Sequence, residues 1–181
     1  MLVKTYCAAV PGLEAITVTI EVCMSRGVMY HLTGLADVAV RESHDRIVAA
    51  LQNNGYKFPV ADITVNMAPA DIRKEGSGYD LPLAIGILAA NGKIDACRLG
   101  NYMMIGELGL DGRLQPVRGA LPIAIKARAD RFKGLIVPKQ NIREAAVVNN
   151  IDVYGMENIT EVIAFFNGDT SVEPTVTDTR K

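Results

Sequence analysis

Cysteine is scarce in this chain, and its spacing matches no metal or disulfide motif. Three cysteines occur among 181 residues, without any C-x-x-C pair. An odd number with such spacing argues against a disulfide framework and against a zinc site. The sequence therefore predicts no metal centre, and it predicts reduced thiols at Cys7, Cys23 and Cys97.

The chain also has no excess of positive charge and no long apolar run. Lys and Arg number 19 against 20 Asp and Glu, and the formal net charge is −1. No global positive field is therefore available to recruit nucleic acid or an anionic membrane, although a local basic patch remains open. No stretch approaches the ~20 apolar residues of a membrane span, and the first residues lack the apolar core of a secretory signal. These absences predict a cytoplasmic protein with no membrane partner.

Two further motifs are missing. No phosphate loop of the G-x-x-x-x-G-K-[ST] type occurs, so nucleotide hydrolysis by that route is not expected of these residues. The two histidines, His31 and His44, have no partner at metal-ligand spacing, which favours structural or solvent-facing roles. We expect no cofactor in this chain.

The most informative stretch that is present runs from Asp71 to Ala90. A polar loop with two glycines leads into a segment that is apolar on nearly every face, which predicts a helix buried on all sides. Asp80 is expected to be its N-cap, with Pro82 in the first turn. Backbone N–H groups ahead of a helix can hold a phosphate or carboxylate. The candidate anion contacts are Lys74, Gly76, Ser77 and Gly78.

The alternative for this loop is a tight turn that only serves to enter the buried helix. Glu75 and Asp80 favour that alternative, because they bring negative charge to the place where an anion would bind.

The periodicity of the remaining chain predicts an α+β fold. Clean alternation of apolar and polar residues in the first half indicates antiparallel strands, and helix and strand alternate in the second half, which indicates at least one parallel pairing. The result is a mixed sheet with helices packed on it. Ser43 is a candidate N-cap inside the first helical segment. We expect strands at 3–10, 15–23, 29–35, 63–67, 134–137 and 151–154, helices at 39–53, 80–90, 119–129, 141–148 and 159–166, and a glycine-rich hairpin at 102–115.

The composition changes at Asn167. The residues that follow are polar, rich in threonine and without periodicity, as in a tether or a frayed end. The sequence therefore predicts one domain over residues 1–166 and a flexible linker over residues 167–181.

Three blocks of sequence, at 34–43, 66–84 and 105–112, resemble the N-terminal domain of the bacterial magnesium-chelatase-like AAA+ ATPases, the ComM/YifB family. The similarity runs from about residue 2 to residue 166. The resemblance implies the ribosomal protein S5 domain 2-like fold that the Lon protease domain shares. It also implies that the linker leads to a AAA+ module that this chain lacks, and that ATP and Mg²⁺ belong to that module.

The resemblance to Lon can be tested at the two catalytic positions. Lon-type proteases use a serine in K-D-G-P-S-A-G and a lysine in G-G-L-K. Laid on this sequence without gaps, the motifs place Gly78 at the nucleophile and Leu121 at the base. Neither residue can transfer a proton, so no catalytic residue is expected. Ser77, one position away, leaves open a Lon-like ATP-dependent serine peptidase, and the loop leaves open a phosphate- or nucleotide-binding domain.

The family resemblance further implies a role in DNA processing, including branch migration in natural transformation, within a hexameric ring. The domain would then be a non-catalytic module for interaction, assembly or DNA guidance. Its expected partners are the AAA+ module of its own parent chain, other copies of the same protein, and DNA. The candidate DNA contacts, for which an ordinary solvated face is the alternative, are Arg41, Arg73, Arg113 and Arg118.

Overall fold

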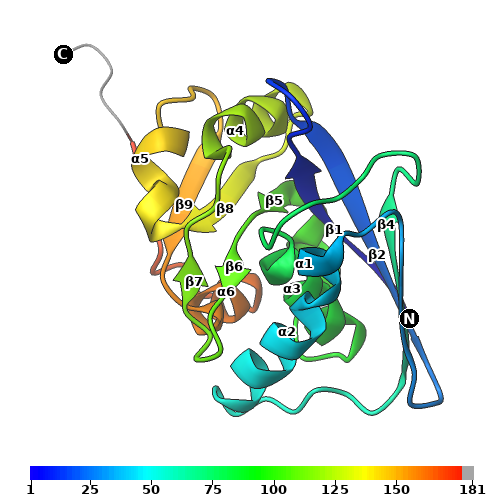
Figure 1. The fold of residues 1–181 in the computed structure, drawn as a ribbon. Helices are drawn as coiled ribbons and strands as arrows, with labels where there is room; N and C mark the ends of the chain where they lie inside the picture. The colour runs from blue at the N-terminus through cyan, green and yellow to red at the C-terminus, as the bar shows by residue number, and fades with distance from the viewer. Residues whose placement is uncertain (177–181) are drawn as a thin grey trace.

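The computed structural model describes residues 1–176 and shows a seven-stranded mixed sheet with helices packed around it (Figure 1). The order of strands in this sheet is β3-β4-β2-β1-β5-β8-β9, and β6 and β7 form a separate ribbon. The predicted α+β architecture is confirmed. The strands are β1 (Leu2–Ala9), β2 (Ile16–Ser25), β3 (Tyr30–Thr33), β4 (Asp62–Ala68), β5 (Tyr102–Met104), β6 (Glu107–Leu108), β7 (Leu114–Gln115), β8 (Gly134–Pro138) and β9 (Asp152–Met156).

Pairing directions follow the prediction with one exception. β1–β2 and β2–β4 are antiparallel, whereas β1–β5, β5–β8 and β8–β9 are parallel. The first half is not wholly antiparallel as predicted, because β3 pairs with β4 in parallel. Two helices lie between these strands in sequence and form the crossover that a parallel pair requires.

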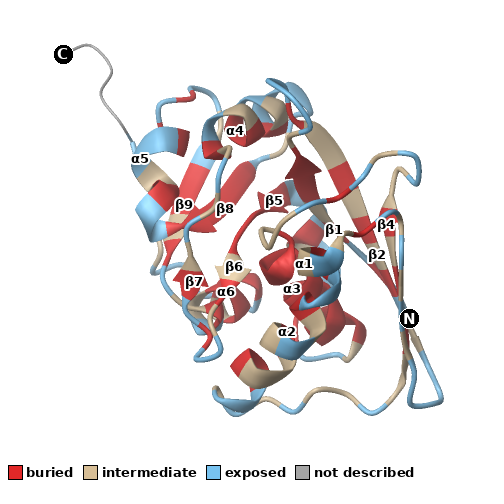
Figure 2. Ribbon diagram, viewed as in Figure 1, coloured by how far each residue is buried: buried red, intermediate tan, exposed pale blue. Residues whose placement is uncertain are grey.

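The helices surround one that is buried throughout. Every residue of α3 is buried, as its apolar sequence predicted (Figure 2). It contacts β1 and β2 on one side and α2 on another. The helices are α1 (Val38–Arg41), α2 (Ser43–Gln52), α3 (Asp80–Ala90), α4 (Ala120–Ala129), α5 (Ile142–Ala145) and α6 (Ile159–Phe166), with 3₁₀ turns η1 (Ala96–Asn101) and η2 (Lys139–Asn141).

Both predicted N-caps are wrong. The N-cap of α3 is Tyr79, and the carboxylate of Asp80 accepts hydrogen bonds from Arg46 and from the amide of Leu108 instead. Ser43 is the first residue of α2, and its buried hydroxyl has no hydrogen-bond partner among the described residues. For Asp80, partners distant in sequence decide the role, so a local capping pattern could not predict it.

Two predicted elements are also divided differently. The helix expected at 39–53 is two helices separated at Glu42. In the segment expected to form one hairpin, β5 joins the main sheet between β1 and β8, and only β6 and β7 form the ribbon. The turn of that ribbon contains Gly112 at φ +89°, which fits the predicted Asp111-Gly112 turn.

After α6 the described chain continues to residue 176 without helix or strand. Val172 packs against the core, and the amide of Thr175 donates a hydrogen bond of 2.8 Å to the carbonyl of Val153 on β9. Residues 177–181 of the expected linker lie outside the described residues, and the boundary at residue 166 stays a prediction. Among residues 1–176, no helix is both long and apolar enough to span a bilayer.

Candidate functional site

A cleft of about 770 Å³ opens where two parallel strands of the sheet separate. β1 and β5 are paired at a single position, Tyr6 with Met103. Beyond that pair, residues 7–9 of β1, Val10 after it and Ile105 after β5 line the cleft, and the loops at 75–79 and 116–119 form its other walls. The carboxyl ends of diverging parallel strands are a common location for ligand sites, because the connecting chains leave a crevice there.

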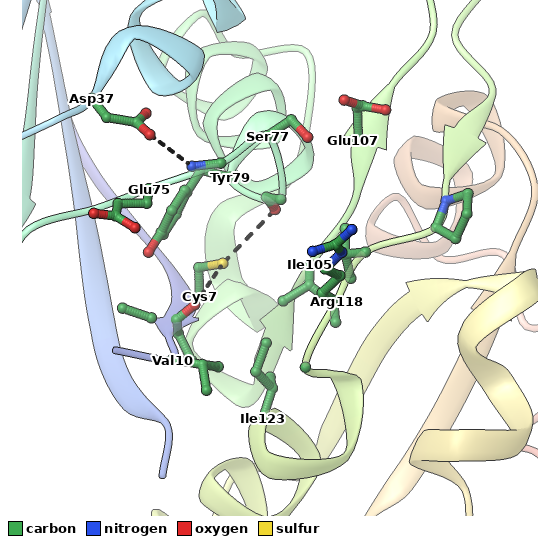
Figure 3. Close-up of a pocket in the computed structure, with 17 residues that line it drawn as sticks. Cys7, Val10, Asp37, Glu75, Ser77, Tyr79, Ile105, Glu107, Arg118 and Ile123 are labelled. Atoms are coloured by element: carbon green, nitrogen blue, oxygen red, sulfur yellow. Dashed lines mark hydrogen bonds between the residues drawn. The ribbon is translucent and has the colours of Figure 1, made fainter. Parts of the chain in front are cut away.

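The loop ahead of α3 is held by the chain's own carboxylate. Asp37 accepts a hydrogen bond of 3.1 Å from the amide of Gly76 and one of 2.8 Å from the amide of Val40, where it caps α1 (Figure 3). The carbonyl of Gly78 accepts the amide of Gly106 at 2.9 Å. The predicted anion position at Gly76 therefore already has a carboxylate partner within the protein.

Only three of the four predicted anion contacts lie at the cleft. Gly76, Ser77 and Gly78 line the cleft, but Lys74 does not. The Lys74 side chain is fully buried and its ammonium donates to the carbonyl of Pro69. Burial lowers the pKa of Lys74, because removal from water disfavours the charged form. Lys74 is thus an internal partner of the loop rather than a cation directed into the cleft.

Of the two positions predicted for the Lon dyad, Gly78 and Leu121, only the first lines the cleft. Gly78 lines the cleft, and a Cβ built on it would lie 3.4 Å from the Cγ1 of Val117. Leu121 does not line the cleft, and its amide donates to Glu144 at 3.0 Å. Ser77 faces the same cavity, but its hydroxyl has no hydrogen bond to a base among residues 1–176. The cleft therefore presents no paired nucleophile and base.

Burial raises the pKa of two titratable groups of the cleft. It raises the pKa of the Cys7 thiol to about 12, so the thiolate is scarce at neutral pH. It also raises the pKa of Tyr79, and nearby Asp37 and Glu75 add to this shift. Both groups can exchange hydrogen bonds with a ligand, but neither is an activated nucleophile.

The charge of the cleft is negative. Asp37, Glu75 and Glu107 line it, against one cation among the described residues, Arg118 (Figure 3). Glu75 is paired with Arg73, so Asp37 and Glu107 are the carboxylates without an ion pair among the described residues, and they favour a basic group over a phosphate.

The four arginines proposed as DNA contacts do not form one patch. Arg118 lies in the cleft, and Arg113 lines a second cavity of about 620 Å³ beside the β6–β7 ribbon. Arg41 donates to the carbonyl of Ala36, and Arg73 pairs with Glu75 at 3.1 Å. Arg118 and Arg113 therefore lie in different cavities. The segments of Arg41 and Arg73 meet, because Ala36 and Lys74 form a parallel bridge.

Sequence reasoning missed four residues that line the cleft: Cys7, Asp37, Tyr79 and Glu107. Asp37 carried a usable signal, since an aspartate directly before a short helical segment is a common N-cap. The other three have no local signal, because β1, the central loop and β6 come together only in the folded sheet.

Comparison with known proteins decides the family. The sequence model of the ChlI subunit of Mg-chelatase matches residues 20–141. The chain belongs to this ChlI family. It is 42% identical over 164 residues to competence protein ComM of Haemophilus influenzae, covering 90% of this chain and 32% of the relative. It is 39% identical over 169 residues to the uncharacterized protein YifB of Escherichia coli, and the match covers 92% of this chain and 33% of the relative.

A more distant similarity extends the family resemblance to Lon. Lon protease 2 of Bacillus subtilis is 29% identical over 110 residues, which cover 61% of this ChlI-family chain and 19% of the relative. The predicted ComM/YifB and Lon-like resemblance is thereby confirmed. The chain spans about a third of the length of the ComM and YifB relatives.

Proposed function

We propose that this chain is a non-catalytic domain of a magnesium-chelatase-like AAA+ ATPase, and that it guides DNA or a partner protein to the ATPase module. The observation that supports this most directly is that the cleft wall carries Gly78, the residue that the motif alignment predicts at the nucleophile position of Lon. In this proposal ATP and Mg²⁺ act only in the AAA+ module, and the parent protein works as a cytoplasmic hexamer.

The absence of peptidase chemistry is the first part of the proposal. Acyl transfer needs a nucleophile within hydrogen-bond reach of a base. The Cys7 thiol is protonated at neutral pH, and Lys74 is bonded to Pro69 outside the cleft. Ser77 is the remaining candidate, and it has no base as a hydrogen-bond partner among the described residues.

A peptidase assay with casein tests this part. We expect no cleavage products by mass spectrometry from the wild type or from Ser77→Ala, with and without ATP. Cleavage by the wild type that is lost in Ser77→Ala would instead establish a serine peptidase.

DNA guidance is the second part. Arg41 and Arg73 are exposed, and their segments meet at the Ala36–Lys74 bridge. In the proposed ring they contact phosphates, and each contact releases counterions and so makes binding dependent on salt. Neither the cleft nor the chain as a whole attracts DNA, because the cleft is acidic and the net charge is −1.

DNA binding by the full-length parent tests this part. For Arg41→Gln/Arg73→Gln we expect the slope of log K against log[salt] to become less negative by about 0.9 for each lost contact. Lys93→Gln, an exposed cation beyond the other end of α3, is the matched control and should leave the slope unchanged. Wild-type affinity and slope in the folded double variant would refute the assignment of these arginines.

A further inference from the structure

We propose that the cleft binds an extended polypeptide segment as an added strand beside β1, and that it selects a segment with a lysine or arginine side chain. This inference rests on the proposed function, since the bound segment is held and not cleaved. Four independent features of the cleft support it: an open strand edge, an unpartnered hydroxyl, a negative charge and a side-chain-free wall.

The first feature is the edge of β1. This strand pairs with β2 along its whole length, from Leu2 to Ala9, but with β5 only at Tyr6. Beyond Tyr6, the edge that faces β5 has no strand partner among the described residues, and residues 7–10 line the cleft. Unpaired N–H and C=O groups on such an edge are a template for an incoming extended chain.

The second feature is the hydroxyl of Tyr79. The residue as a whole is 3% exposed, and its hydroxyl makes no hydrogen bond within residues 1–176. Its ring extends from the loop toward Cys7 at the end of β1 (Figure 3). The hydroxyl oxygen is not among the fully buried polar atoms, so a backbone carbonyl or amide of a bound segment can reach it from the cleft. The hydroxyl is therefore a polar group of the cleft that is available to a bound backbone.

The third feature is the charge of the cleft walls. Glu107 is half-buried and has no ion-pair partner among the described residues. Asp37 adds a second carboxylate, which accepts two backbone amides, whereas Glu75 is paired with Arg73. Arg118 is the cation of the opposite wall, where it can donate to backbone carbonyls. This balance favours a basic side chain and disfavours an acidic one or a DNA phosphate.

The fourth feature is Gly78, which keeps the wall between the loop and Val117 free of a side chain. Its φ lies outside the left-handed region, so its backbone tolerates other residues. A Cβ at this position would lie 3.4 Å from the Cγ1 of Val117 and would enter the cleft. Gly78→Val should therefore fill the cleft without imposing backbone strain.

Fluorescence anisotropy with labelled peptides tests the inference. The probe is a short peptide of alternating valine and threonine with one central lysine; a second has glutamate at that place, and a third has the lysine but N-methylated alternate amides. We expect the lysine peptide to bind at least about tenfold more tightly than either of the others. Tyr79→Phe and Glu107→Gln should each weaken binding by about threefold to tenfold.

Two further variants complete the design. Gly78→Val should abolish binding while its circular dichroism and Tm stay near those of the wild type. If Gly78→Val does not fold, Tyr79→Phe tests the site independently. Glu173→Gln, an exposed carboxylate near β9, is the matched control and should bind as the wild type. Equal binding of the lysine and glutamate peptides, full binding of the N-methylated peptide, or no binding at all would overturn the inference.

The peptide's mass after incubation separates this inference from the proposed function. An intact peptide that binds supports both. A peptide that binds and is cleaved would refute the non-catalytic role but leave the binding site in place. An intact peptide that fails to bind would refute the site and leave the non-catalytic role standing.

Discussion

Arg46 on α2 holds the carboxylate of Asp80, the first residue of α3, through two hydrogen bonds. Nε lies 2.7 Å from Oδ2, and Nη2 lies 2.9 Å from Oδ1. The Asp80 side chain is fully buried and also accepts the amide of Leu108 on β6 at 3.0 Å. Hydrogen bonding to Asp80 raises the pKa of Arg46, because the carboxylate favours the charged guanidinium. One carboxylate thus joins α2, α3 and β6 next to the cleft.

Asp80→Ala should lower the free energy of unfolding by about 3 kcal/mol, because breaking a buried ion pair leaves its partner uncompensated. The variant leaves both the Arg46 guanidinium and the Leu108 amide without this acceptor. Urea denaturation measures the change. Glu42→Ala removes an exposed carboxylate 3.8 Å from the same guanidinium and should cost less than about 1 kcal/mol. Similar losses in the two variants would contradict this interpretation.

Gly86→Ala should destabilise the fold by about 1–3 kcal/mol, as overpacking of a core does. A Cβ on Gly86 would lie 2.9 Å from the Cγ2 of Val22, because α3 packs closely on β2. Gly100→Ala is the matched control, since a Cβ there meets no atom within 4 Å, and it should change stability by no more than about 0.5 kcal/mol. Thermal unfolding of both variants gives the comparison, and equal Tm values would argue against close packing at Gly86.

Stability at alkaline pH should depend on Cys7. Its pKa is about 12 in the folded protein against an ordinary value of 9.0, so the unfolded chain loses this proton first as pH rises. The contribution of this pKa shift to the free energy of unfolding is complete below pH 9. Between pH 9 and 12 it is lost at up to about 1.4 kcal/mol per pH unit. Urea unfolding from pH 8 to 11 should show a shallower decline for Cys7→Ala. Parallel curves for the variant and the wild type would refute the shift.

Thiol labelling at neutral pH checks the same burial by another route. Cys23 and Cys97 are exposed and Cys7 is buried, so iodoacetamide should modify the first two well before the third. Peptide mass spectrometry resolves the sites. Addition of urea should make all three react alike, and equal rates without urea would contradict the position of Cys7.

Asp37→Ala should loosen the loop ahead of α3. It removes the acceptor for the amides of Gly76 and Val40 and should cost about 1 kcal/mol, as loss of a helix cap does. Amide hydrogen exchange at these two positions should accelerate. Asp37→Asn keeps one acceptor oxygen and should show an intermediate effect, so unchanged exchange in both variants would show that the carboxylate does not hold the loop.

The sequence alone determined the elements whose signal is local. The apolar run of α3 predicted its burial on every side, alternation predicted the strands of the first half, and α6 begins and ends at the predicted residues. The assignment of Gly78 and Leu121 to the Lon dyad positions comes from a motif comparison alone and stays a prediction.

Only the tertiary structure decided which charges and hydroxyls meet. The sequence predicted Asp80 as a helix cap and Lys74 as an anion contact. In the folded protein Asp80 accepts hydrogen bonds from Arg46, and Lys74 donates one to the carbonyl of Pro69. Tyr79 and Glu107 share the cleft because sheet pairing brings distant segments together. A buried polar side chain takes the partner that compensates its desolvation, and that partner is usually remote in sequence.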